Sequence, residues 1–204
     1  DSVLPEEPKI LVFGTYGSGE NFFTLKGEVE AVLNGLNVNT ATFTADSTNP
    51  SYHPGRCAFI SIDGQEIGYI GQIHPLVAKN YGIDAEVFCA ELNMEQLFAM
   101  ELPEATYTPL PKYPAVTRDI SFVCDEEITV AYAENVINNA AGKLLRNVRL
   151  FDIYRGTGIP EGKKSMAFSL ELRADDRTLT DTDSDFVTSN VLDALQKVIG
   201  ATLR

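Results

Sequence analysis

The sequence is poor in cysteine, histidine and basic side chains, and it lacks any long apolar run. Its three cysteines are widely separated, at Cys57, Cys89 and Cys124. An odd and scattered set argues against a disulfide or metal framework and is typical of buried free thiols in a reducing cytosol. No apolar run is long enough to cross a bilayer, and no charged-then-apolar leader opens the chain. We therefore expect a cytoplasmic protein without a membrane partner.

The two histidines, His53 and His74, each lie next to a proline, in Tyr52-His53-Pro54 and His74-Pro75. A zinc site or an acid–base pair is one interpretation, because histidine titrates near neutral pH. Two histidines without a third ligand in view favour structural hydrogen bonding instead. We predict no metal site and no catalytic residue, with a hydrolase that uses His53 or His74 as an alternative.

Basic residues are scarce and unevenly distributed. The net charge is −13, which argues against a general nucleic-acid binder. Residues 1–111 carry 4 basic and 15 acidic side chains, a balance that suits a domain meeting protein partners. Residues 143–177 carry 8 basic and 5 acidic side chains and form the positive region of the chain.

That positive region contains a long predicted hairpin over residues 148–173. Its two halves alternate with the period of a half-buried strand, and the Gly- and Pro-rich residues 156–162 between them predict a reversal. One face is apolar and needs a cover of helices: Phe151, Ile153, Met166, Phe168, Leu170 and Leu172. The other face carries Asp152, Tyr154, Ser165, Ala167, Ser169 and Glu171, and it has the composition of an open surface for a flat ligand.

The first hundred residues predict a second sheet. Residues 9–13, 41–43, 57–62, 65–73 and 87–92 are expected to be strands, and Asp63-Gly64 is a strong hairpin signal. Helices are expected near residues 25–36 and 76–81, with turns over 45–56. The glycines between 14 and 19 suggest a phosphate loop, but no Lys-Ser/Thr pair follows, so a flexible loop is the better interpretation.

The last ninety residues predict the order β-α-β-β-α-β, the ferredoxin-like arrangement that places both helices on one face of a four-stranded sheet. Four prolines in residues 102–114 indicate a stiff linker before this part. We expect strands at 119–123 and 201–204 beside the hairpin, and helices at 129–141 and 182–199. The second helix should begin with a capping box of Thr182 and Asp185 and end at Gly200. Its predicted inward residues are Val187, Val191, Ala194, Leu195 and Val198.

Several runs resemble the β-subunit family of bacterial phenylalanyl-tRNA synthetases. Lys112-Tyr113-Pro114-Ala115-Val116-Thr117-Arg118-Asp119-Ile120, Leu150-Phe151-Asp152-Ile153-Tyr154-Arg155-Gly156, Gly162-Lys163-Lys164-Ser165 and Arg177-Thr178-Leu179-Thr180 are similar to its ferredoxin-fold anticodon-binding domain. Asn21-Phe22-Phe23-Thr24-Leu25-Lys26-Gly27, Tyr52-His53-Pro54-Gly55-Arg56 and Gly68-Tyr69-Ile70-Gly71-Gln72-Ile73-His74-Pro75 are similar to the end of its core module. The chain starts without Met, so we expect a C-terminal piece of a longer subunit.

The resemblance implies an α+β chain in three parts. Residues 1–102 would end a class II synthetase-like antiparallel-sheet module, 103–114 would be the linker, and 115–204 would be the anticodon-binding domain. In this family the α subunit makes the aminoacyl bond with ATP and magnesium, and two α and two β subunits assemble. We find none of the ATP-binding motifs of class II synthetases in residues 1–102, so we predict a chain without catalysis or cofactor of its own.

The resemblance also implies an RNA site for tRNA(Phe). Asp152, Tyr154 and Ser165 match the positions that receive the first anticodon base, a guanine, and Arg118, Arg155, Lys164 and Arg204 are candidates for phosphate contacts. Simpler roles remain open: Tyr154 could be a cross-strand packing partner, and Asp152 could pair with Arg149 or Arg155. Ferredoxin-like domains also bind small molecules, so a regulatory domain is an alternative function.

Overall fold

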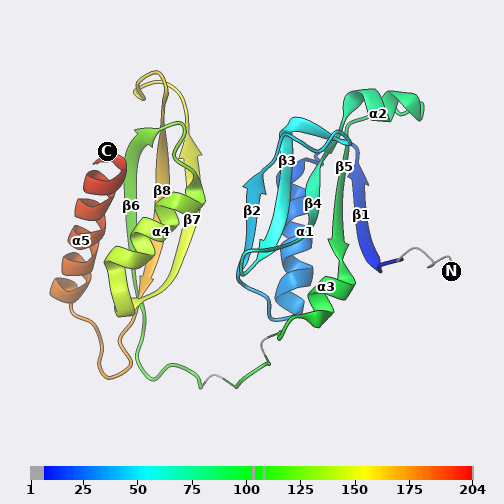
Figure 1. The fold of residues 1–204 in the computed structure, drawn as a ribbon. Helices are drawn as coiled ribbons and strands as arrows, with labels where there is room; N and C mark the ends of the chain where they lie inside the picture. The colour runs from blue at the N-terminus through cyan, green and yellow to red at the C-terminus, as the bar shows by residue number, and fades with distance from the viewer. Residues whose placement is uncertain (1–6, 103, 108, 204) are drawn as a thin grey trace. The chain divides into compact units, whose positions relative to one another are not determined.

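A computed structural model describes residues 7–102, 104–107 and 109–203. The chain divides into two compact units, residues 1–107 and 108–204, and the division falls within the proline-rich segment (Figure 1). Each unit has its own hydrophobic core and is described by itself. Arg204 lies outside the described residues.

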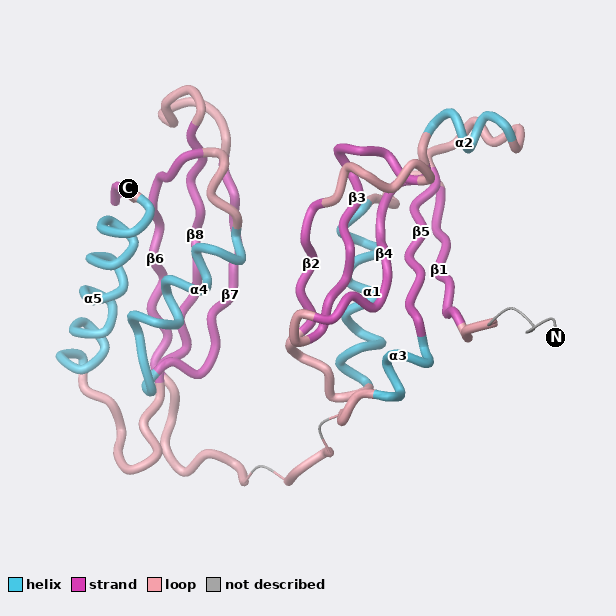
Figure 2. The backbone as a smooth tube through the Cα atoms, in the orientation of Figure 1, coloured by secondary structure: helices cyan, strands magenta, loops and turns pink. Residues whose placement is uncertain are grey.

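The first unit is a five-stranded antiparallel sheet with helix α1 on one face (Figure 2). The strand order is β1-β5-β4-β3-β2, with every neighbouring pair antiparallel. The strands are β1 (Ile10–Tyr16), β2 (Ala41–Ala45), β3 (Tyr52–Ile62), β4 (Gln65–Ile73) and β5 (Val87–Asn93). The helices are α1 (Phe22–Gly35), α2 (Pro75–Asn80) and α3 (Met94–Ala99).

Local sequence explains the ends of these elements. Asn21 caps α1 and forms a capping box with Thr24, and the helix buries Leu25, Val29 and Leu33 against the sheet. The predicted Asp63-Gly64 hairpin is confirmed, with φ of 49° and 82° at the two residues. Two predictions were wrong. β1 continues to Tyr16 through residues expected in a loop, and β3 already begins at Tyr52, inside the expected turn region.

The second unit has the predicted β-α-β-β-α-β order. It comprises β6 (Val116–Asp125), α4 (Val130–Ala141), the 3₁₀ turn η1 (Gly142–Leu144), β7 (Leu145–Tyr154), β8 (Lys163–Leu172), α5 (Asp181–Ile199) and β9 (Thr202–Leu203). The antiparallel sheet has the order β7-β8-β6-β9. Figure 1 shows both helices on one face of this sheet, so the ferredoxin-like prediction is confirmed.

The core of this unit lies between the sheet and the two helices. Phe122 and Phe168 stack at its centre with ring centroids 5.9 Å apart, and both rings are buried. α5 contributes Val187, Val191 and Leu195, as predicted, but Val198 is 53% exposed and Ile199 is buried in its place.

The predicted start of α5 was also wrong. Its N-cap is Thr180, whose hydroxyl accepts from the backbone N–H of Asp183, and the Asp183 carboxylate accepts from the N–H of Thr180 in return. The cap therefore lies two residues before the expected one, and the helix begins at Asp181. Gly200 ends it as predicted, with the left-handed φ of 64° that glycine adopts without strain.

The three cysteines are free thiols. Burial raises the pKa of the Cys57 thiol to about 11, which keeps it protonated at neutral pH. Among the residues that the structure describes, no helix has the length and hydrophobicity to cross a membrane.

Candidate nucleic-acid interface

The hairpin of β7 and β8 brings Asp152, Tyr154 and Ser165 onto one face of the second sheet. Tyr154 lies directly opposite Ser165, and Asp152 lies opposite Ala167, two residues further along β8. Directly opposed residues of an antiparallel pair share a face. On the other face, Met166, Phe168 and Leu170 pack into the core beneath the helices. The three predicted residues therefore lie on the face that α4 and α5 leave uncovered.

We call this uncovered face the platform. Its three rows follow from the strand register and contain Asn147, Arg149, Asp152 and Tyr154 on β7, Ser165, Ala167, Ser169 and Glu171 on β8, and Thr117, Asp119, Ser121 and Val123 on β6. The central row, on β8, begins with the small side chains of Ser165, Ala167 and Ser169. They form a low strip, a shallow part of the surface beside the larger residues of β7. Such a surface suits a flat group laid along the hairpin.

A β-bulge at Phe151 changes which residues of β7 face the core. The register shifts between Leu150, which lies opposite Phe168, and Asp152, which lies opposite Ala167. The extra residue interrupts the alternation of the strand. Our assignment of Phe151 to the covered face was therefore wrong: it is 51% exposed, and Leu150 packs against the core in its place.

Tyr154 is 37% exposed, and its ring lies next to the loop that joins the two strands. Its hydroxyl donates to the carbonyl oxygen of Thr157 at 3.4 Å, a long contact. A side chain at Gly156 would place its Cβ 2.8 Å from the same hydroxyl. The absence of a side chain at Gly156 therefore leaves room for the ring in this position.

Ser165 forms part of the floor of the platform. It is only 3% exposed, and its Oγ lies 3.4 Å from Oγ of Ser121 on the neighbouring strand. Asp152, in contrast, is exposed. The predicted site thus combines an exposed carboxylate, a half-exposed aromatic ring and a nearly buried hydroxyl.

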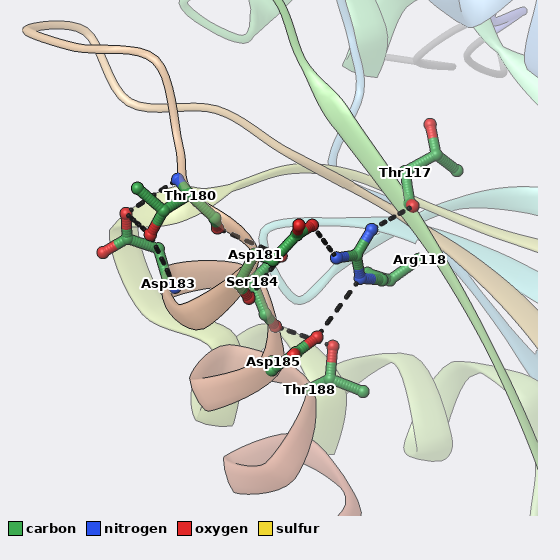
Figure 3. A network of polar contacts seen from close by, with 8 residues as sticks. All are labelled: Thr117, Arg118, Thr180, Asp181, Asp183, Ser184, Asp185 and Thr188. Carbon is green, nitrogen blue, oxygen red and sulfur yellow. Dashed lines mark hydrogen bonds and ion pairs between the residues drawn. The ribbon is translucent and has the colours of Figure 1, made fainter.

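Arg118 does not join the platform residues. It lies opposite Leu170, on the covered face, and its guanidinium reaches α5 (Figure 3). Nη2 is 2.8 Å from Oδ1 of Asp181, and Nε is 3.5 Å from Oδ1 of Asp185. These contacts tie β6 to the first turns of α5, a structural role that the sequence did not indicate.

Arg155 and Lys164 both converge on Glu126. Arg155 forms a forked ion pair with the Glu126 carboxylate, with a shortest distance of 2.7 Å, and this pair lowers the pKa of the carboxyl. Lys164 is 7% exposed, and its ammonium group donates to the backbone carbonyl of Glu126 at 2.7 Å. Both cations are therefore already engaged within the protein, and the role of Arg204 lies outside the described residues.

The histidines take the structural role that we favoured. Nδ1 of His74 accepts from the backbone N–H of Leu76 at 3.1 Å and caps α2, and Nδ1 of His53 accepts from the N–H of Gly55 at 3.0 Å. No group of three or more potential metal ligands occurs among the residues described by the structure.

Arg149 is the platform residue that sequence reasoning missed. Strict alternation would put Arg149 and Asp152 on opposite faces, but the bulge between them places both on the platform. A single sequence carries no clear signal for such a bulge, because the strand pattern continues on either side of it.

Comparison with known proteins agrees with this architecture. Residues 111–204 match the family model of the ferredoxin-fold anticodon binding domain, and residues 1–94 match that of the phenylalanyl tRNA synthetase beta chain CLM domain. The chain is 41% identical over its whole length to the phenylalanine–tRNA ligase beta subunit of Clostridium tetani, and it covers 26% of that protein.

Further relatives give the same result. The phenylalanine–tRNA ligase beta subunit of Clostridium acetobutylicum is 39% identical over 98% of this chain, which covers 25% of that relative. The Bacillus subtilis beta subunit is 44% identical over 90% of the chain, which covers 23% of it. The chain spans about a quarter of the length of these relatives. It belongs to the phenylalanine–tRNA ligase β-subunit family, and its second unit is a ferredoxin-fold anticodon-binding domain.

Proposed function

We propose that the second unit binds tRNA(Phe) and reads the first anticodon base, a guanine, on the platform. The observation that carries this proposal is the common exposed face of Asp152 and Tyr154, next to the low strip of Ser165 and Ala167. Sheet-based RNA readers use such a surface to hold splayed, single-stranded bases.

The chemistry of the two side chains suits guanine. Its Watson–Crick edge offers two N–H donors, and an ionised carboxylate such as that of Asp152 accepts both. The ring of Tyr154 offers a stacking surface worth about 1–3 kcal/mol per base. The carboxylate supplies the selectivity in this arrangement, and the ring supplies affinity for any base.

Our proposal assigns no catalytic step to this chain. Aminoacylation, with its ATP and magnesium, would take place on an α subunit in a cytoplasmic assembly of two α and two β subunits. The first unit would contribute contacts to protein rather than to RNA. Its edge strand β1 supports this assignment, because it exposes Ile10, Val12 and Tyr16 on the face opposite α1.

A binding titration tests the RNA-reading function. The 204-residue chain is titrated with tRNA(Phe) and with the same tRNA carrying another base at the first anticodon position, at one fixed salt concentration. The proposal predicts tighter binding of the guanine form. Equal affinity for the two RNAs would contradict it and would favour a small-molecule role for the ferredoxin-like domain.

The protein-contact role needs a separate test. Val12→Glu places a charge on the exposed face of β1 and should weaken co-purification with the α subunit, while tRNA binding by the second unit stays unchanged. Thr44→Glu, on the exposed part of the opposite edge strand β2, is the control. Undiminished recovery of the α subunit with Val12→Glu would contradict a role of β1 in that contact.

A further inference from the structure

Arg149 stands apart from the other arginines that the structure describes. Six of these are ion-paired with a carboxylate at 3.7 Å or less: Arg56, Arg118, Arg146, Arg155, Arg173 and Arg177. Arg149 is exposed, and its side chain makes no hydrogen bond or ion pair with any described residue. In a chain with a net charge of −13, an arginine without a carboxylate partner is unusual.

The position of Arg149 connects it to the proposed anticodon site. It lies opposite Ser169, and Asp152 lies opposite Ala167, so the two are separated by two residues of β8, or about 7 Å. No ion pair joins the Arg149 guanidinium to the Asp152 carboxylate, which removes the pairing considered from the sequence. Both groups therefore remain available on the same face.

The charges around Arg149 favour a cation there. The platform also carries the carboxylates of Asp152 and Asp119, which repel an RNA backbone, and that of Glu171, which is paired with Arg173 at 3.7 Å. Lys163, at the end of β8, is paired with Asp125 at 2.6 Å. Within the described part of the platform strands, Arg149 is thus the unpaired cation that can offset this repulsion.

We infer that Arg149 contacts the phosphate of a nucleotide next to the base read by Asp152. This inference rests on the function proposed above and assigns Arg149 as a residue that contacts the RNA backbone. A guanidinium matches a phosphate with two parallel hydrogen bonds, and such contacts position the RNA without reading its sequence. The β-bulge at Phe151 is the structural device that puts this cation on the platform.

The salt dependence of RNA binding tests this assignment. The slope of log K against log salt is negative, and Arg149→Ala should make it less steep by about 0.7, the value for one single-strand phosphate contact. This corresponds to an affinity loss at 0.1 M salt that is about fivefold greater than the loss at 1 M salt. Arg149→Lys keeps the charge and should restore the slope. Discrimination between anticodon variants should be unchanged in both.

Arg146→Ala is the matched control, because Arg146 lies on the same strand but is paired with Asp175 at 2.6 Å. It should leave the slope as in the wild type, and all variants should keep the wild-type melting temperature. If Arg149→Ala leaves the slope unchanged, or alters the preference among anticodon variants, the phosphate assignment is wrong. The proposed function still stands in that case, provided that the wild-type chain discriminates between the anticodon variants. A wild-type chain that does not discriminate between the anticodon variants would overturn both the phosphate assignment and the proposed function.

Discussion

Tyr154 lies on the platform with about a third of its surface exposed, and its ring is outside the core. Replacing it with alanine should therefore remove base stacking without removing core packing. We expect Tyr154→Ala to weaken tRNA binding by about 1–3 kcal/mol, roughly 5- to 150-fold. A titration of the variant measures this, and its melting temperature should stay close to that of the wild type.

Tyr132 provides the control for that variant. It is a tyrosine of similar exposure, 47%, on α4, which covers the opposite face of the sheet. Tyr132→Ala should leave tRNA affinity unchanged. Equal losses of affinity in the two variants, or a large fall in the melting temperature of Tyr154→Ala alone, would contradict a stacking role for Tyr154.

Asp152 is the residue to which we assign selectivity. Asp152→Asn keeps the shape of the side chain but replaces one acceptor oxygen with a donor, so it should relax the preference for guanine at the first anticodon position. The measurement is the ratio of affinities for tRNA(Phe) and an anticodon variant. Asp119→Asn removes the same charge from β6 on the same face and should keep that ratio. A preserved ratio in Asp152→Asn would show that another group reads the base.

At the scale of elements, α5 depends on its N-terminal capping box. Hydrogen bonds from the backbone and side chain of Thr180, and then from Arg177, lower the pKa of Asp183. A carboxyl whose pKa is lower in the folded than in the unfolded protein stabilises the fold. This stabilisation is fully present at pH values above the unfolded pKa, about 3.9, and it is lost as the pH falls through the folded pKa.

Asp183→Asn should therefore be less stable than the wild type at pH 7, and the difference should shrink as the pH falls below about 4. Urea unfolding at several pH values measures the effect. Asp193→Asn, in the same helix but outside the cap, is the control for the loss of one negative charge. A constant difference between pH 7 and pH 3 would mean that the charge of Asp183 does not contribute to the cap.

The β7–β8 hairpin depends on the apolar residues beneath the platform. Phe168 is fully buried and stacks on Phe122. Phe168→Ala should cost about 3–5 kcal/mol of the unfolding free energy, through lost burial and the cavity left behind. Chemical unfolding of the second unit measures this. A cost below about 1 kcal/mol would imply that the core collapses around the missing ring.

The sequence predicted the elements well where a local pattern determines them. Hydrophobic periodicity located α4 and α5, and Asp63-Gly64 located a turn, because these signals depend on neighbouring residues. Predictions failed where tertiary contacts decide between close alternatives. Val198 and Ile199 are adjacent apolar residues, and the packing of α5 decides which of them is buried.

The candidate site shows the same limit. Alternation alone put Asp152, Tyr154 and Ser165 on one face, and the structure has them there. It could not show the bulge at Phe151 or the position of Arg149. Nor could it reveal that Arg118, Arg155 and Lys164 are engaged by Asp181 and Glu126, because these partners are distant in sequence.

In the whole chain, the two units have separate cores. The charge of each unit suits its proposed role, which is protein contact for the first and RNA binding for the second. The first unit is strongly acidic, whereas the basic residues concentrate around the hairpin of the second. Phe168→Ala should therefore lower the protection of the second unit against hydrogen exchange, while α1 and its sheet keep theirs. Loss of protection in both units would show that they fold as one.

If RNA lies on the platform, a map of the surface that it contacts will show it there. Backbone amide shifts of the chain would be recorded by NMR as an anticodon stem-loop of tRNA(Phe) is added. We predict that the largest changes occur at Arg149, Asp152, Tyr154 and Ser165, with small changes around the exposed Phe186 of α5. Changes concentrated on α4 and α5, with the platform unaffected, would contradict the account.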